Sequence, residues 1–458
     1  MRAMRLLCLL AAAAAVLSAA KPEAWVPMRW PWAEPESLAL LEGSRVNCLL
    51  MDAGAITKGF LEVAKSRRVE VLAVVTSAQA GGAQAAIERG AAGLALRGEF
   101  AAADRERMRK LAPQTVEFVA RVDLRFADPP AVLATEQGVW PGVNVQENDT
   151  AHAAPSGAPW IDTNSGFLRF ARASAPEAMV WIGVEPPKGQ AIPAQRYLQV
   201  IGDAAMMGAR WVIALDGDLA ARLSRREEKA LKIWARINGV LSYYEDHAEW
   251  RRGRPHGQLA VVQDVANGGA LSGGILDMIA VKHTPVRAVE PSRMSASSFD
   301  DCQMAVNVAV DGLTDPQKAI LREFTKRGGT LLTGPPGWRM PAPKREQVTL
   351  AKEDIDKLDQ IWKEVNTMTG RKNLGVRLFN VSSLLSNLTA EGQKLRLQLV
   401  NYSDYPVDSI AVHVLGTYRA ARLLRPGKPP LELKPYENED GVGVDIDLIE
   451  SVATVEIE

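Results

Sequence analysis

Short apolar runs alternate with helical stretches from about residue 45 to residue 250. Nearly continuous apolar runs between helices are typical of parallel strands that are covered on both faces. The pattern therefore predicts an α/β fold, a TIM-like (β/α)₈ barrel over residues 45–254. Without the run at residues 159–162, seven strands would give an open or irregular barrel. The expected strands are residues 46–52, 69–76, 91–98, 115–123, 139–145, 159–162, 178–187 and 210–218.

A second α/β region follows at residues 255–340. Its apolar runs GQLAVVQD, TPVRAVEP, CQMAVNVAV and TLLTG indicate strands, and LSGGILDMIAVKH indicates a helix. A further helix is expected to begin at Asp315-Pro316, a capping residue followed by a first-turn proline, and to end at Gly328-Gly329. This alternation predicts a compact flavodoxin-like layer domain.

The period of the pattern changes in the last part of the chain. Residues 341–373 are rich in proline and charge around one expected helix at residues 354–365, which indicates a connector. From residue 374 to residue 458, runs such as KLRLQLVNY, SIAVHVL and VGVDIDL alternate apolar and polar positions. Such alternation between turn residues predicts a small antiparallel β-sandwich.

The first twenty residues have the layout of a secretory signal peptide. Arg2 and Arg5 are basic, residues 6–17 are apolar, and residues 18–20 are small;. The apolar run is too short for a stable membrane span, and an uncleaved N-terminal anchor is the alternative. We therefore expect a secreted or periplasmic protein. Residues 21–44 contain WVPMRWPW and are expected to form an irregular tail on the barrel, with a sugar-stacking platform as the alternative.

Charge and cysteine content exclude several functions. The chain has 54 basic and 54 acidic residues, so nothing favours binding to nucleic acid or to an anionic membrane. Only Cys48 and Cys302 remain after signal removal, and they lie in different predicted domains. The sequence contains no Cys/His metal spacing, glycine-rich phosphate loop or G-x-S-x-G elbow;. We therefore expect no metal and no cofactor.

Polar residues at the ends of the predicted strands are the candidate site residues. In a (β/α)₈ barrel, ligands meet residues at the carboxyl ends of the strands. This rule selects residues after the first, fourth, sixth, seventh and eighth predicted strands, namely Asp52, Arg121, Asp162, Asn164, Glu185 and Asp216.

Three of these residues are carboxylic acids on consecutive predicted strands. Cleavage of a glycosidic bond generally needs two carboxyl groups, one to protonate the leaving oxygen and one to attack the sugar or activate water. We expect Asp162, Glu185 and Asp216 to converge, with Glu185 as proton donor and Asp162 or Asp216 as nucleophile or base. Helix capping is the alternative role for Asp162 and Asp216, because each precedes a helical stretch.

Three tryptophans lie near the same strand ends. A sugar ring packs its C–H face on an aromatic ring, while its hydroxyls seek carboxylate and amide partners. Trp140, Trp160 and Trp181 are therefore candidate stacking residues, with Trp160 favoured because it follows a long loop rich in glycine, proline and serine. The alternative for each tryptophan is packing in the core.

The order of the predicted domains resembles the plan of multi-domain β-galactosidases. The segment MAVNVAVDGLTDPQKAILREFTKRGGTLLTG is similar to their trimerisation module, and KLRLQLVNYSDYPVDSIAVHVLG resembles the C-terminal sandwich of exported glycosidases. This resemblance implies a carbohydrate substrate or ligand and a homo-oligomer. The middle segment also resembles class I glutamine amidotransferase domains, but Cys302 precedes a strand rather than following one. The barrel lacks the Asn-Glu pair that ends the family's fourth strand, and only Glu185 is placed like its nucleophile.

These patterns predict a glycoside-hydrolase-like protein that acts on an oligosaccharide or polysaccharide through two carboxyl groups at barrel strand ends. One alternative is a non-catalytic carbohydrate-binding protein on a degenerate glycosidase scaffold. A structural or oligomerisation module is the other. Two carboxyl groups within about 10 Å in one pocket with an aromatic wall would favour hydrolysis.

Overall fold

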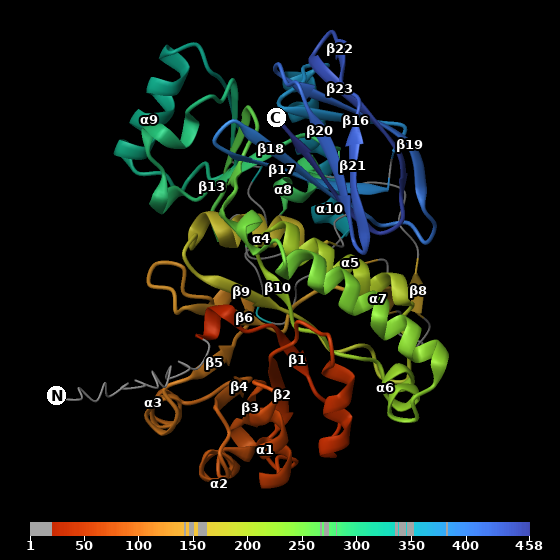
Figure 1. The fold of residues 1–458 in the computed structure, drawn as a ribbon. Helices are drawn as coiled ribbons and strands as arrows, with labels where there is room; N and C mark the ends of the chain where they lie inside the picture. The colour runs from red at the N-terminus through yellow and green to blue at the C-terminus, as the bar shows by residue number, and fades with distance from the viewer. Residues whose placement is uncertain are drawn as a thin grey trace, which may run out of the picture.

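The computed structural model describes residues 21–458 apart from 142, 146–150, 154–162, 266–267, 270–273, 281, 335–337, 339–344, 346–351 and 382. The N-terminal half forms a barrel, and the middle and C-terminal regions pack together beyond one side of it (Figure 1). Helices α4 (Ser165–Ser174) and α5 (Ala194–Met206) lie between the barrel strands and those regions.

Eight parallel strands form the barrel sheet in the order β1-β2-β3-β4-β5-β6-β9-β10. The sheet closes where β1 meets the end of β10. There the Arg29 N–H donates to the Ile213 carbonyl at 2.8 Å, and the Ile213 N–H donates to the Pro27 carbonyl at 3.2 Å. The predicted TIM-like barrel is confirmed. Its strands are β1 (Pro27–Arg29), β2 (Cys48–Asp52), β3 (Glu70–Thr76), β4 (Gly93–Arg97), β5 (Thr115–Phe118), β6 (Val132–Thr135), β9 (Met179–Ile182) and β10 (Arg210–Trp211).

The first barrel strand comes from residues 21–44, which the sequence pattern assigns to an irregular tail. The structure corrects this expectation, because β1 pairs in parallel with β2. Trp25 and Met28 have no exposed surface. The strand is only three residues long and begins with a proline, a position where the missing N–H is tolerated;. A strand of three residues is too short to show an apolar period in the sequence.

Two further strands differ from the prediction. Strand β6 was not predicted at all. Residues 139–145, predicted as a barrel strand, contribute only Val143–Val145 to β7, which pairs in an antiparallel manner with β8 (Ala151–Ala153) outside the barrel sheet. The strand predicted at residues 159–162 lies outside the described residues. The barrel therefore has the expected eight strands, but two of them, β1 and β6, are not among the strands that the sequence pattern predicts.

Helices cover most of the outer barrel wall. They are α4 and α5 together with α1 (Lys58–Ser66), α2 (Gly82–Arg89), α3 (Ala102–Leu111), α6 (Gly217–Ser224) and α7 (Glu228–Glu245). Strands β5 and β6 are instead joined through η4 (Arg121–Asp123), a short 3₁₀ turn. A cavity of about 700 Å³ occupies this side of the wall and is lined by residues of both strands.

Apolar side chains fill the interior of the barrel. Trp181 is fully buried there, and its ring centroid lies 6.4 Å from the ring centroids of both Trp25 and Phe118. A filled interior leaves the carboxyl ends of the strands as the place where a ligand can meet the barrel. The remaining members of this cluster are Cys48, Leu50, Leu72, Ala95, Val116, Val132, Ala134 and Val212.

The middle region has the expected α/β layers. Its parallel sheet has the order β13-β12-β14-β15. Helix α9 (Asp315–Lys326) begins after Thr314, which forms a capping box with Gln317, so the cap lies one residue before the predicted one. The helix expected in the connector is α10 (Lys352–Thr369), whose buried apolar residues share a core with this sheet. The other elements are β12 (Leu259–Val262), α8 (Ile275–Ala280), β13 (Val286–Val289), β14 (Met304–Asn307) and β15 (Thr330–Thr333).

Two antiparallel sheets end the chain, as the period of two predicts. Their orders are β11-β17-β18-β24-β20-β21 and β16-β19-β23-β22, and a shared apolar core lies between them. The strands are β11 (Arg254–Pro255), β16 (Val376–Phe379), β17 (Leu384–Glu391), β18 (Lys394–Asn401), β19 (Val407–Leu415), β20 (Ala421–Arg425), β21 (Lys428–Leu433), β22 (Tyr436–Asn438), β23 (Gly441–Ile449) and β24 (Val452–Ile457).

Within the described ranges, no helix has both the length and the apolar character needed to cross a membrane. The expected signal peptide, residues 1–20, lies outside those ranges, so export stays a prediction.

Candidate functional site at the barrel mouth

Four charged residues meet at the carboxyl ends of the barrel strands, and we call them the mouth cluster: Arg29, Arg97, Glu136 and Glu185. They follow or end β1, β4, β6 and β9. Arg97 Nε lies 2.5 Å from Glu136 Oε1, and Arg97 Nη2 lies 3.1 Å from Glu185 Oε1. Arg29 contacts the same two carboxylates through its two terminal nitrogens. Each arginine therefore bridges both glutamates.

The cluster is partly open to solvent. The Glu185 side chain is 54% exposed, whereas that of Glu136 is 26% exposed. Burial lowers the pKa of Arg29. For Arg97, burial acts in the same direction, but the hydrogen bond and charge of Glu136 outweigh it and the pKa is raised. The cluster thus offers two cations and two carboxylates at one edge of the barrel, with Glu185 the more accessible acid.

A neighbouring ion cluster continues the rim. Arg345 lies 2.6 Å from a Glu99 oxygen and 2.8 Å from an Asp123 oxygen. Its carbonyl accepts a hydrogen bond at 2.7 Å from the side chain of Gln137, which follows Glu136 in sequence. A residue of the connector therefore lies at the ends of β4, β5 and β6, beside the mouth cluster.

Asp52 lies at the end of β2, as predicted, but its carboxylate is engaged in a local turn. Its Oδ1 accepts a hydrogen bond from the Gly54 N–H at 2.8 Å. Its Oδ2 accepts one from the Gln79 side chain at 3.4 Å. The side chain is exposed. Among the residues described, no contact joins Asp52 to the mouth cluster.

Asp216 is a helix cap rather than a member of the site. Its Oδ1 accepts a hydrogen bond from the Leu219 N–H at 3.0 Å, and it is the N-cap of α6. Its Oδ2 accepts hydrogen bonds from the Tyr197 hydroxyl at 2.8 Å and the Ile192 N–H at 3.2 Å. The residue is buried. The predicted convergence of Asp216 with Glu185 is not seen, because these donors hold the carboxylate inside the protein.

Asn164 and Arg121 are also buried structural residues. Asn164 exchanges two hydrogen bonds with the backbone of Val139, at 2.8 and 2.9 Å. The Arg121 guanidinium lies 4.2 Å from the centre of the Phe167 ring. Burial lowers the pKa of Arg121 to about 9. Neither side chain reaches solvent where a sugar would bind.

The described tryptophan candidates belong to the core. Trp181 fills the barrel interior. Trp140 is 4% exposed, and its ring packs edge-on against Tyr197 and Trp211 with centroid separations of 5.2 Å. Trp160 and Asp162 lie outside the described residues, so their predicted roles are neither supported nor opposed.

The sequence reasoning missed three members of the mouth cluster. Arg29 was placed in a tail, Arg97 ends a predicted strand but was not selected, and Glu136 follows a strand that was not recognised. The sequence does indicate Arg97 as a candidate, because Arg97 and the glycine after it end the predicted strand AAGLALRG. In the portion of the chain that is described, no group of three or more His, Cys, Asp or Glu residues could hold a metal ion.

Comparison with known proteins gives a fold but no family. No family model matches the sequence, and no curated protein matches it. The chain is similar in structure to alpha-L-fucosidase isoenzyme 2 from Paenibacillus thiaminolyticus, with a TM-score of 0.58 and 9% identity over 96% of this chain and 98% of that one. It also matches a beta-galactosidase from Rahnella sp. R3, with a TM-score of 0.42 and 8% identity over 93% and 98% of the two chains. The match to the fucosidase, whose TM-score is above 0.5, shows that the two chains share a fold.

Proposed function

We propose that this protein cleaves a glycosidic bond in an oligosaccharide or polysaccharide at the barrel mouth, with Glu136 and Glu185 as its two carboxyl groups. The observation that carries this proposal is that the single guanidinium of Arg29 contacts both carboxylates. Two groups held by one guanidinium lie close enough to flank one linkage. Glycosidases place their carboxyl pair about 5 Å apart for retention and roughly 6.5–9.5 Å apart for inversion.

The two glutamates differ in the roles they suit. We assign Glu185 as nucleophile or base because its side chain is the more exposed of the two, so a sugar or an attacking water reaches it more readily. We therefore assign Glu136 as the proton donor, the role that the sequence pattern suggested for Glu185. A proton donor must lie within hydrogen-bond reach of the leaving oxygen, so Glu136 can act only after the substrate has displaced its guanidinium partners;.

A second candidate function is carbohydrate binding without hydrolysis. It is favoured by the observation that each arginine contacts both glutamates. Carboxylates in ion pairs accept hydrogen bonds from sugar hydroxyls, and the guanidinium groups donate to sugar oxygens. Such a cluster recognises a sugar without any group that gives up a proton.

Comparison of Glu185→Gln and Glu136→Gln with the wild type separates these functions. Hydrolysis is measured on a panel of aryl glycosides and polysaccharides, and binding of the same sugars by calorimetry. The control is Asp218→Asn, since Asp218 is 56% exposed and pairs only with Arg222 among the described residues. We expect each glutamine variant to lose about a hundredfold or more in rate, and the control to keep its rate.

The other outcomes are equally informative. Hydrolysis that survives both glutamine substitutions would overturn the proposal. A wild type that hydrolyses no substrate but binds a sugar through Glu185 would replace it with the second candidate.

A further inference from the structure

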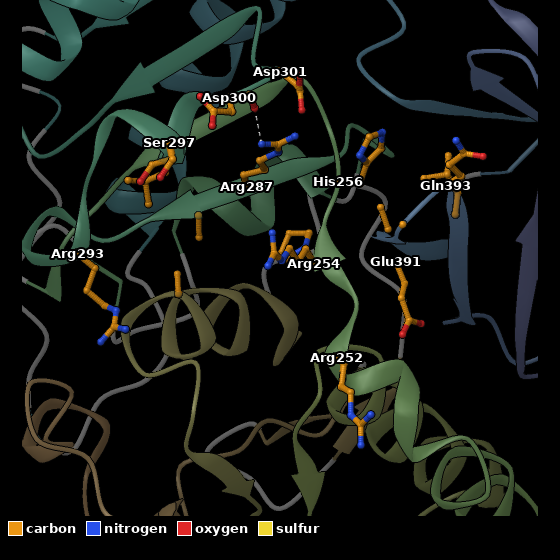
Figure 2. Close-up of a pocket in the computed structure, with 18 of the residues that line it drawn as sticks. Arg252, Arg254, His256, Arg287, Arg293, Ser297, Asp300, Asp301, Glu391 and Gln393 are labelled. Atoms are coloured by element: carbon orange, nitrogen blue, oxygen red, sulfur yellow. Dashed lines mark hydrogen bonds between the residues drawn. The ribbon is translucent and has the colours of Figure 1, made fainter.

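A large groove lies between the middle region and the β-sandwich, away from the barrel mouth. Its cavity of about 1240 Å³ is lined by β13, by residues 290–301, by the linker residues 252–256 and by the turn between β17 and β18 (Figure 2). A second cavity of about 530 Å³ adjoins it and shares Arg252 and Arg254. We call the two cavities together the interdomain groove.

Four arginines line the larger cavity, two from the linker and two from the middle region: Arg252, Arg254, Arg287 and Arg293 (Figure 2). Within the described ranges, none of the four forms an ion pair. Arg287 Nη1 donates a hydrogen bond to the backbone carbonyl of Asp300 at 2.7 Å. Its Nε is buried without a hydrogen-bond partner. These guanidinium groups therefore keep most of their donors for a ligand.

The acidic residues of the groove do not neutralise these arginines. Glu391 pairs with Arg396 at 2.7 Å, and Glu458 pairs with Lys394 at 3.0 Å. Glu290 accepts a hydrogen bond from the Ser292 N–H at 2.8 Å. Glu290, Asp300 and Asp301 therefore have no cationic partner in the described structure, and Asp300 and Asp301 are exposed. The groove thus combines four guanidinium groups outside any ion pair with three carboxylates that also lack a cationic partner.

We propose that the interdomain groove binds an anionic carbohydrate chain through carboxylate or sulfate groups. The planar guanidinium fork matches such oxyanions with two parallel hydrogen bonds. Asp300 and Asp301 would accept hydrogen bonds from the neutral hydroxyls of the same chain. An acidic peptide supplies anions but few hydroxyl donors, whereas the lining of the larger cavity is more polar than apolar and offers carboxylate acceptors for hydroxyl groups. This site does not depend on hydrolysis at the mouth.

The test is calorimetric titration of the whole protein at about 50 mM salt, where screening is weak. The probes are an oligogalacturonate, a sulfated galactan oligosaccharide and a neutral malto-oligosaccharide, with poly-glutamate as the acidic peptide for comparison. The test variant is Arg252→Glu with Arg254→Glu, two exposed residues. The matched control is Arg225→Glu with Arg322→Glu, two exposed residues outside the groove that give the same change in net charge.

We expect at least one anionic probe to bind the wild type and to lose tenfold or more in affinity, about 1.4 kcal/mol, in the groove variant. The control variant, Glu185→Gln and Glu136→Gln should bind it as the wild type does, which separates this site from the mouth. Carboxylate and sulfate probes identify which anion is preferred. Equal binding of the neutral probe, no binding of either anionic probe, unchanged affinity in the groove variant, or tighter binding of poly-glutamate would each overturn the proposal.

Discussion

At the scale of single residues, Asp216 and Glu185 both follow barrel strands but make different contacts. The difference arises from the residues that follow each acid in the sequence. Asp216 is followed by the first turn of α6, whose N–H groups are free, and it accepts a hydrogen bond from Leu219;. Glu185 is followed by Pro186-Pro187, which have no backbone N–H to donate;. Its carboxylate therefore stays available to Arg29 and Arg97. This difference is readable from the sequence.

Replacement of Asp216 by alanine should reduce stability without a specific effect on sugar hydrolysis or binding. The variant loses a cap and leaves the buried Tyr197 hydroxyl without its acceptor. We expect the free energy of unfolding in urea to fall by about 2–3 kcal/mol. Asp218→Ala, on the exposed side of the same helix, should cost less than about 0.5 kcal/mol. A folded Asp216→Ala protein of wild-type stability that has lost sugar hydrolysis would restore Asp216 to the site.

A buried aspartate should make stability depend on pH. Burial raises the pKa of Asp203 to about 6, and Asn164 and Tyr402 act against that shift. A raised pKa in the folded state means that the Asp203 contribution to stability is fully present below pH 4 and is lost as the pH rises through about 6. The change is on the order of 3 kcal/mol.

Unfolding of Asp203→Asn and the wild type in urea, compared between about pH 4 and pH 7, tests this expectation. The wild type should lose more stability than the variant over this range. Asp218→Asn is the matched control and should follow the wild type. Parallel pH profiles for Asp203→Asn and the wild type would contradict the raised pKa.

At the scale of elements, the apolar run that surrounds a strand, rather than the length of the strand, decides whether the sequence reveals it; even the two-residue β10 lies in a longer apolar run. The strands β2, β3 and β4 have five to seven residues and were predicted from their apolar runs. The three-residue β1 and the four-residue β6 were missed; β1 begins with Pro27, and Pro129-Pro130 precede β6. Both segments are strands because they pair with strands distant in sequence, and the local apolar pattern does not show such pairing. Because Arg29 and Glu136 lie at their ends, half of the mouth cluster was missed with them.

Removal of residues 21–32 tests whether β1 is part of the barrel. Trp25 and Met28 have no exposed surface, and Trp30 is 4% exposed. A chain that begins at residue 33 should therefore lose cooperative thermal unfolding, whereas one that begins at residue 21 should keep it. An unchanged melting transition in the shorter chain, followed by circular dichroism, would show that this segment is only a tail.

At the scale of the whole molecule, the order of the barrel, the α/β layers and the sandwich can be predicted from changes in the period of the apolar pattern. The contacts between these three parts cannot be predicted in this way. Asp277 on α8 accepts hydrogen bonds from the Thr163 hydroxyl at 2.6 Å and the Ser165 hydroxyl at 3.0 Å. Arg169 on α4 donates to the Asn387 side chain on β17 at 2.9 Å. These partners are more than a hundred positions apart in sequence, so no local pattern predicts them. The expected homo-oligomer likewise stays a prediction.

The central claim is that the mouth cluster is where the molecule meets a sugar. A crystal structure of Glu185→Gln with a bound oligosaccharide from the hydrolysis or binding panel tests it most directly. We expect a sugar ring in contact with residues 136 and 185, with Arg29 or Arg97 shifted from its carboxylate partner. A sugar bound elsewhere, over a mouth whose remaining ion pairs are intact, would contradict it.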